Sequence, residues 1–278
     1  MTTNVFDKKS KQDLVNYLAH ASKYIQMDTS RVYEVTLNQI KFFKNQNIPY
    51  EDLREMKVLE ARWYKALETG KPDYSVYASP FYFVDIWVCW VTYSRKYLQM
   101  IQSPKSMSGK SIVQDMGNVR TVIDLGCGFG YTCAAWKIIY PNAQVIGTNL
   151  SETPQYKMCV DLSSQYGFSV TDTYDNISAD VVFASEYFEH IIDPIAHLTD
   201  IIRKCNPKHF LIASTFNSPS IGHFNEYEYK GKLYSGTRMS RMFNDALRHY
   251  GYEKVQTNCW NNRPAYWKKK VIHDKINH

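Results

Sequence analysis

Residues 121–130, with the sequence TVIDLGCGFG, constrain the fold of this chain more than any other segment. Val122, Ile123 and Leu125 are β-branched or aliphatic residues that suit a strand covered on both faces. Glycines then follow at every second position, and a backbone without Cβ atoms can turn sharply and approach a ligand closely. Residues 131–140 can begin a helix, whose N-terminus attracts an anion. The segment therefore predicts a strand, a ligand-binding turn and a helix.

The spacing of Gly126, Gly128 and Gly130 indicates which ligand the turn binds. A nicotinamide or flavin fingerprint has the spacing G-x-G-x-x-G and needs a small residue where this chain has Tyr131. The spacing here is G-x-G-x-G, with Asp124 two residues before the first glycine. This pattern resembles motif I of the class I S-adenosylmethionine (SAM) dependent methyltransferases. The resemblance implies SAM as the cofactor and a Rossmann-like sheet.

The resemblance also implies contacts to each part of SAM. The carboxylate of its methionine tail suits the helix N-terminus and the N–H groups of the loop, while Asp124 faces the ammonium group. Cys127 lies within the loop and is expected to be a small filler. Asn149 stands where the family usually has an acid that binds both ribose hydroxyls. A carboxamide offers one acceptor and one donor group, so we expect an aspartate at 149 to bind SAM more tightly.

Asn149, Asp172 and Ser185 lie at the ends of predicted strands. The first two have two interpretations each, and the third is a candidate because of its position. Asn149 is either the ribose contact or a turn residue before a helix over residues 152–166. Asp172 follows a short strand over 167–171, where the family often binds the adenine amino group, but a solvated turn acid fits equally. Ser185 ends the strand over 180–185, at the edge where parallel sheets bind ligands.

The segment EYFEHIIDP follows that strand and resembles the E-H-x-x-D-P region of methyltransferases of quinone and metabolite pathways. His190 in this segment has a pKa range suited to a general base, although it could equally be a structural histidine that orders the loop. Glu186 is expected to touch the methionine amine or to stabilise a turn. His223 lies in the segment GHFNEYEY, a predicted loop that would shape the acceptor pocket. His190, His223 and Glu226 lack the tight spacing of metal ligands, so we expect no metal.

Strands that alternate with helices predict an α/β class, here a Rossmann-like, mainly parallel sheet of seven strands. Further strands are expected over residues 208–215, 252–257 and 265–272. The pair Asp193 and Pro194 is expected to begin one helix, and residues 237–250 to form another. We place the methyltransferase domain at residues 116–278.

Residues 1–115 read as a helical extension or cap, because apolar residues recur there at helical spacing. A long aromatic helix is expected over residues 81–102, followed by a linker over 103–111. Its residues Trp87, Trp90 and Tyr97 are interpreted either as core or as part of a lid over the substrate, and both can hold.

Composition narrows the function only slightly. The six cysteines form no C-x-x-C pair and indicate a reducing compartment, and the polar N-terminus shows no signal peptide, so we expect a cytoplasmic protein without a membrane span. The net charge of +6 is a weak indication of nucleic-acid binding. The acceptor is expected to be a small molecule or a nucleotide. The alternatives are RNA or DNA modification, or a binding module that has lost catalysis.

Overall fold

The computed structural model describes residues 4–6, 10–103, 109–257, 259 and 263–270. Its central sheet has seven strands in the order β3-β2-β1-β4-β5-β9-β8. Five of them run parallel, namely β1 (Thr121–Leu125), β2 (Gln144–Thr148), β3 (Ser169–Thr171), β4 (Val181–Ser185) and β5 (His209–Ala213). At the other edge β9 (Ala265–Lys269) is antiparallel to both β5 and β8 (Tyr252–Val255). The predicted mainly parallel sheet of seven strands is confirmed.

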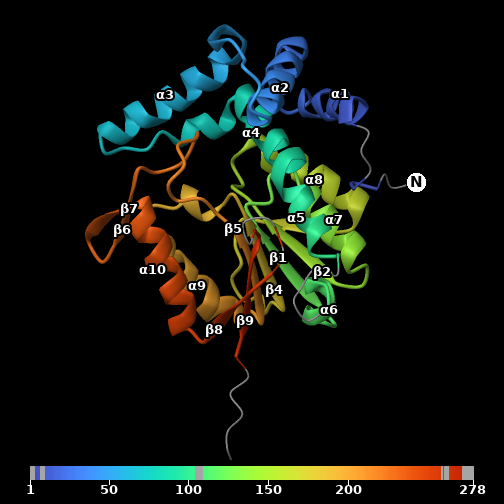
Figure 1. Cartoon of the computed structure of the whole chain (residues 1–278). Helices are drawn as coiled ribbons and strands as arrows, with labels where there is room; N and C mark the ends of the chain where they lie inside the picture. Colours follow the sequence, from blue (N-terminus) through green and yellow to red (C-terminus); the bar gives the residue numbers. More distant parts are fainter. Residues whose placement is uncertain (1–3, 7–9, 104–108, 258, 260–262, 271–278) are drawn as a thin grey trace, which may run out of the picture.

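Helices cover both faces of this sheet, which explains its continuous apolar strands (Figure 1). Helices α7 (Tyr131–Ile139) and α8 (Pro154–Tyr166) lie on one side, and α9 (Pro194–Cys205) and α10 (Gly236–His249) lie on the other. The short helix α6 (Ile112–Met116) precedes β1. All five residues of β5 are buried, as expected for a strand covered on both faces.

The N-terminal part of the chain is helical, as predicted, and gathers at one end of the sheet (Figure 1). Its elements are α1 (Ser10–Ala21), α2 (Thr29–Phe43), η1 (Tyr50–Leu53), α3 (Arg54–Glu68), η2 (Tyr74–Ala78) and α4 (Pro80–Cys89). A π-helical turn, η3 (Trp90–Ser94), joins α4 to α5 (Arg95–Met100). The predicted aromatic helix therefore exists, but it is interrupted by wider turns of a kind often found at functional sites.

The aromatic residues of this run are core. Trp87, Trp90 and Tyr97 are all buried. The Trp87 ring stacks on Tyr17 of α1 at a centroid distance of 4.5 Å, and Trp90 stacks on Tyr131 of α7 at 5.8 Å. These contacts fix α4 and η3 against the helix that follows the glycine loop.

One loop prediction was wrong. The segment GHFNEYEY is not all loop, because β6 (Glu226–Tyr229) and β7 (Lys232–Ser235) form an antiparallel hairpin. Its turn contains Lys230 and Gly231, both with positive φ, which is the backbone shape of a tight hairpin. The described residues of the predicted linker, 103 and 109–111, belong to no helix or strand, and Ser111 caps α6 in a reciprocal pair with Gln114. Residues 104–108 lie outside the described residues, as do the last two positions of the strand predicted over 265–272.

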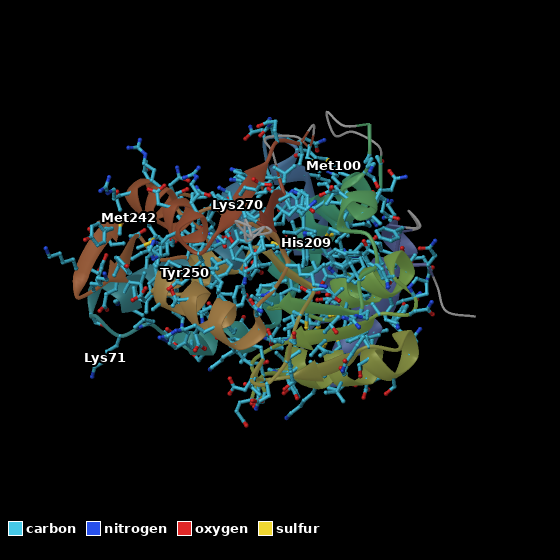
Figure 2. All side chains as sticks on the ribbon, turned by 90° about the horizontal axis from the view of Figure 1, so that it is seen from below. Lys71, Met100, His209, Met242, Tyr250 and Lys270 are labelled. Carbon is cyan, nitrogen blue, oxygen red and sulfur yellow. The ribbon has the colours of Figure 1, made fainter. Side chains whose placement is uncertain are left out.

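The amino end of the sheet carries a closed polar network. His209 begins β5 and lies near the middle of the molecule when it is seen from below, while Met242 and Tyr250 mark α10 to one side (Figure 2). The Tyr266 hydroxyl donates to Asp115 Oδ2 at 2.7 Å and lies 3.0 Å from His209 Nδ1. This end of the sheet is thus joined to α6 by hydrogen bonds.

Candidate active site

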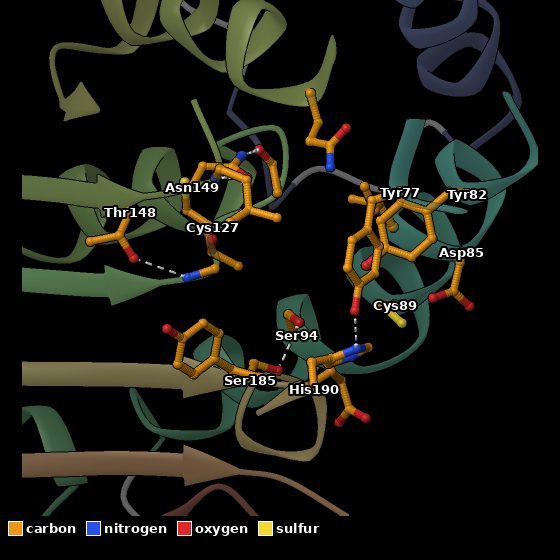
Figure 3. A pocket seen from close by; sticks show the side chains of 18 of the residues that line it. Tyr77, Tyr82, Asp85, Cys89, Ser94, Cys127, Thr148, Asn149, Ser185 and His190 are labelled. Atoms are coloured by element: carbon orange, nitrogen blue, oxygen red, sulfur yellow. Dashed lines mark hydrogen bonds between the residues drawn. The ribbon is translucent and has the colours of Figure 1, made fainter. Parts of the chain in front are cut away.

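One cavity of about 1170 Å³ lies at the carboxyl ends of β1, β2 and β4. Figure 3 shows Cys127, Thr148 and Asn149 across this cavity from Tyr77 and the residues of α4. The opening is large enough for a cofactor together with a second small ligand. Parallel sheets bind ligands at this edge, as the sequence predicted.

The glycine loop forms one wall of the cavity. Gly126 and Gly128 have φ values of +63° and +56°, a region that disfavours residues with a Cβ atom. A Cβ at Gly126 would lie 2.5 Å from the Tyr187 ring, and one at Gly128 would lie 2.9 Å from Ile86 Cγ2. Gly130 has a φ of +87° and is the N-cap of α7. The loop therefore needs glycine for its backbone shape and for its close neighbours.

Asp124 is buried and lines the cavity next to the glycine loop. Its Oδ2 accepts a hydrogen bond from Cys133 Sγ at 3.3 Å. Burial, with the nearby Cys127 thiol, raises the pKa of the Asp124 carboxyl well above its ordinary range. No ion pair reaches this carboxylate in the part of the chain that the structure describes. A ligand ammonium group would supply the missing cation, so Asp124 fits the methionine end of SAM.

Asn149 ties the loop to β2. Its Nδ2 donates to the Gly128 carbonyl at 2.7 Å, and its Oδ1 accepts from Leu150 N at 2.8 Å. Both the nitrogen and the oxygen of the carboxamide are thus hydrogen-bonded to backbone groups. One lone pair of Oδ1 and the second N–H of Nδ2 are left for a ribose hydroxyl.

The other predicted cofactor residues are also at the cavity. Asp172 is exposed on its rim, after β3. The Ser185 hydroxyl lies 2.9 Å from the Ser94 hydroxyl of η3. Cys127 is buried, with its sulfur 3.6 Å from that of Cys159. The structure therefore brings the predicted cofactor residues to one cavity, except Gly130, which caps α7 behind the lining.

His190 lies at the opposite end, in the short helix η4 (Phe188–His190). Its Nδ1 is 3.2 Å from the Tyr77 hydroxyl, as drawn in Figure 3, and its ring centroid is 4.7 Å from that of His223. Burial, followed by the field of His223, lowers the pKa of His190 well below its ordinary value. His190 is therefore a neutral imidazole at pH 7, the form that can accept a proton.

His223 is held by the helical region. Its Nδ1 lies 2.7 Å from the Ser218 carbonyl oxygen, which makes this nitrogen the N–H donor. The Trp63 indole of α3 donates to the His223 carbonyl at 2.6 Å. The Tyr64 hydroxyl meets both backbone groups of Ser220, at 3.1 and 3.2 Å. Helix α3 thus fixes the loop that carries His223.

Glu186 has a strained backbone and a half-buried side chain. Its φ is +51°, which is rare for a residue with a side chain. Burial, followed by the charge of Glu189, raises the pKa of the Glu186 carboxyl well above its ordinary value, and the guanidinium of Arg263 opposes that rise. Strain of this kind is found most often at functional sites.

Sequence reasoning missed several residues of the acceptor end. Tyr77, Tyr82, Asp85 and Arg263 line the cavity but lie far from the motifs in the sequence. One signal was visible for Asp85, because it is a lone acid within the apolar run from Pro80 to Cys89.

The described residues contain neither a metal-binding cluster nor a membrane-spanning helix. No group of three or more histidine, cysteine or carboxylate side chains there is placed to hold a metal ion. None of the helices there combines the length and the apolar character needed to cross a bilayer.

Comparison with solved structures finds methyltransferases at low identity. An O-methyltransferase family protein from Burkholderia thailandensis is 14% identical, with a TM-score of 0.49, over 78% of this chain and 71% of that one. The N-methyltransferase NodS from Bradyrhizobium japonicum, solved with S-adenosyl-L-homocysteine (SAH), is 10% identical with a TM-score of 0.42, over 63% and 86%. The match to the StiE O-methyltransferase domain is 20% identical with a TM-score of 0.32, and it covers 38% of this chain and only 42% of that one.

Comparison with curated proteins finds no match. A family model described as "Methyltransferase domain" matches residues 93–259, which is more than half of the chain. The matched region contains the glycine loop, Asp124 and His190. The chain therefore belongs to the methyltransferase domain family, and SAM is its cofactor.

Proposed function

We propose that this protein transfers a methyl group from SAM to a small-molecule acceptor bound beside His190. The observation that carries this function is the single cavity, which is lined by Asp124 and Gly128 at one end and by Tyr77 and His190 at the other. A cofactor and an acceptor bound in one cavity can be aligned with each other for transfer.

The residues at the cofactor end fit the parts of SAM. Asp124 would hold the ammonium group, and the N-terminus of α7 the carboxylate. Asn149 would offer Oδ1 to the ribose, and Asp172 would accept from the adenine amino group. SAM supplies an activated methyl group on a sulfonium, so the protein has little to do beyond alignment and proton removal.

His190 is the proposed general base. Its neutral imidazole would take the proton that a hydroxyl or amine acceptor loses as the bond to carbon forms. Tyr77 and His223 contact the ring and would hold it in place. Glu186 would keep a neutral carboxyl group in the cavity wall, and Ser185 would fix η3 through Ser94.

Residues 1–115 would act as the cap of the acceptor end, with the catalytic domain at 116–278. Contacts from Trp63, Tyr64 and Tyr77 to the loops of His190 and His223 support that role. The family match begins at residue 93, within η3, so the cap and the catalytic domain share the aromatic helical run.

The acceptor could be a nucleotide, and RNA or DNA is the second candidate class. Two basic residues near the C-terminus are already engaged, since Lys268 pairs with Asp115 at 3.2 Å and Lys269 donates to Asn206. This weakens the case for a nucleic-acid surface. A cytoplasmic location is part of the same proposal and is supported by the six free cysteines.

Incubation with methyl-labelled SAM tests this function. The purified protein is offered separate small-metabolite and nucleic-acid fractions of a cell extract, with the Gly128→Val variant as control. We expect label in a product of the small-metabolite fraction that the variant does not form. Label in nucleic acid would favour the second class, and SAM binding without any labelled product would favour an inactive binding module.

A further inference from the structure

One face of α4 and η3 lines the acceptor end of the cavity. The lining residues recur at helical spacing, namely Tyr82, Asp85, Ile86, Cys89, Trp90 and Tyr93. Ser94 of η3 also lines the cavity and is hydrogen-bonded to Ser185; of the six recurring residues, all but one are apolar or aromatic. Figure 3 shows the exception, Asp85, beside Tyr82 and Cys89.

The Asp85 carboxylate has no hydrogen-bond or ion-pair partner in the described residues. Lys and Arg residues are not among the groups that act on its pKa. Glu186, another carboxyl at this end, differs in that the guanidinium of Arg263 acts on its pKa. Asp85 is half-buried and lines the cavity, so a ligand bound there would meet a carboxylate that no protein cation neutralises, and a cationic group on that ligand would pair with it.

Aromatic rings surround the same position. Tyr77 and Tyr82 meet edge to face at a centroid distance of 4.8 Å, and both line the cavity. The Tyr77 ring also lies 6.2 Å from that of Tyr74, which is a further lining residue. A carboxylate beside tyrosine rings is an environment that stabilises organic cations through charge and cation–π contact.

The pKa of Asp85 is consistent with cation binding. Burial raises the pKa of its carboxyl to about 6, while His223 lowers it and Glu60 raises it slightly. The group is therefore mostly ionised at neutral pH, and a bound cation would favour the ionised form further.

We propose that Asp85 binds a positively charged amino group of the acceptor and that the cavity therefore selects amine-bearing aromatic or aliphatic small molecules over neutral and acidic ones. This deepens the proposed function, on which it rests, by naming the substrate class. Asp85 acts as a binding residue, and proton removal from the methylated atom remains with His190.

Three probes with the same phenol ring test this assignment. Tyramine carries an ammonium group, 4-ethylphenol is the neutral analogue, and 3-(4-hydroxyphenyl)propionate carries a carboxylate. Calorimetry measures the binding of each probe to the full chain saturated with SAH. We expect tyramine to bind about tenfold or more tightly than the neutral analogue, as a desolvated charge pair does, and the carboxylate to bind weakest.

Two variants locate the effect. Asp85→Asn keeps the size and shape of the side chain but removes its charge, so tyramine should lose its roughly tenfold advantage while 4-ethylphenol binds as before. Glu60→Gln is the matched control, because Glu60 is the other carboxylate whose field reaches Asp85, but it lies on α3 outside the cavity lining and pairs with Lys57. It should keep the preference for tyramine.

Titration with SAH separates this proposal from the broader function. Failure of the wild-type chain to bind SAH overturns both. If SAH binds to the wild type and to Asp85→Asn alike, the variant is folded and its probe data are valid. Tyramine that fails to bind the wild type, equal binding of the three probes, or an undiminished tyramine preference in Asp85→Asn each overturns the role of Asp85 alone.

Discussion

The two ends of the central sheet differ in whether their carboxylates have partners within the protein. At the amino end, Asp180 Oδ2 accepts from the Arg120 and Thr121 N–H groups at 2.7 and 3.1 Å, and its Oδ1 pairs with Lys208 at 2.8 Å. At the carboxyl end, no ion pair in the described residues reaches Asp124 or Asp85. Asp180 at the amino end is paired within the protein, whereas Asp124 and Asp85 at the carboxyl end would gain a cationic partner only from a ligand.

Two histidines with lowered pKa values show the same difference. Both have a pKa lowered chiefly by burial, that of His209 to about 4. His209 lies against the hydroxyl of Tyr266, inside the closed network. His190 contacts Tyr77 and faces the cavity. A perturbed pKa alone therefore does not identify a catalytic residue, and the proposed role of His190 rests on its position at the cavity.

The largest effect is expected at the glycine loop. Gly128→Val should lower SAM affinity by about 100-fold or more, because the side chain would clash with Ile86 and cannot adopt the left-handed backbone without strain. Calorimetry measures the affinity, and circular dichroism should show nearly unchanged helix content.

Gly70→Val is the matched control. Gly70 has a φ of +70° after α3, but a Cβ atom added there would have no neighbour within 4 Å. It shares the backbone strain without touching the cavity, so its SAM affinity should equal that of the wild type. Equal affinity of Gly128→Val and the wild type would contradict the loop's assignment.

The next effect separates the two histidines. His190→Asn should reduce turnover by roughly 100-fold while SAM affinity is spared, since proton transfer commonly contributes that much. The deficit should shrink at high pH for an acceptor that ionises unaided. His209→Asn should keep full turnover. Full turnover of the His190 variant near neutral pH would make that residue structural and leave catalysis to alignment.

His209 should instead affect stability. Its pKa in the fold, about 4, lies below its ordinary value of 6.5, so the unfolded chain binds more protons between these values. Its contribution is complete above pH 6.5 and is lost as the pH falls toward 4. His209→Asn should lower the free energy of unfolding by about 1–2 kcal/mol at pH 7 and make it less sensitive to acid. Urea unfolding at pH 7, 5.5 and 4.5 measures this; parallel curves for variant and wild type would refute it.

The smallest effect concerns Asn149. The sequence alone led us to expect tighter SAM binding by an aspartate, but Nδ2 holds the Gly128 carbonyl. Asn149→Asp would lose this donor and place a carboxylate beside a carbonyl oxygen, so SAM affinity should fall by about fivefold, or about 1 kcal/mol. Calorimetry decides the sign, and a tighter complex would show that the ribose contact dominates.

Most of the fold could be predicted because its signals are local. The strand predicted from Val122, Ile123 and Leu125 is β1, and it ends before Gly126 as expected. Helices α7, α8 and α9 follow from their capping residues and apolar spacing. The hairpin of β6 and β7 was missed, although the Lys230–Gly231 pair between alternating residues is a turn signal. The short strands there have little apolar patterning to distinguish them from a loop.

The site was predictable at its cofactor end and much less at its acceptor end. The glycine loop, Asp124 and Asn149 follow one another along β1 and β2, so one motif locates them. Asp85 and Arg263 meet the cavity from segments far apart in the chain, and only tertiary packing brings them together. The hydrogen bond from Asn149 to Gly128 likewise depends on a loop conformation that the sequence pattern does not specify.

A crystal structure of the chain with SAH tests most directly whether the carboxyl end of the sheet is the catalytic site. We predict SAH in the cavity, with its amino group on Asp124, its adenine near Asp172 and its sulfur turned toward the space beside His190. SAH bound elsewhere, or with its sulfur directed away from that space, would contradict methyl transfer within this cavity.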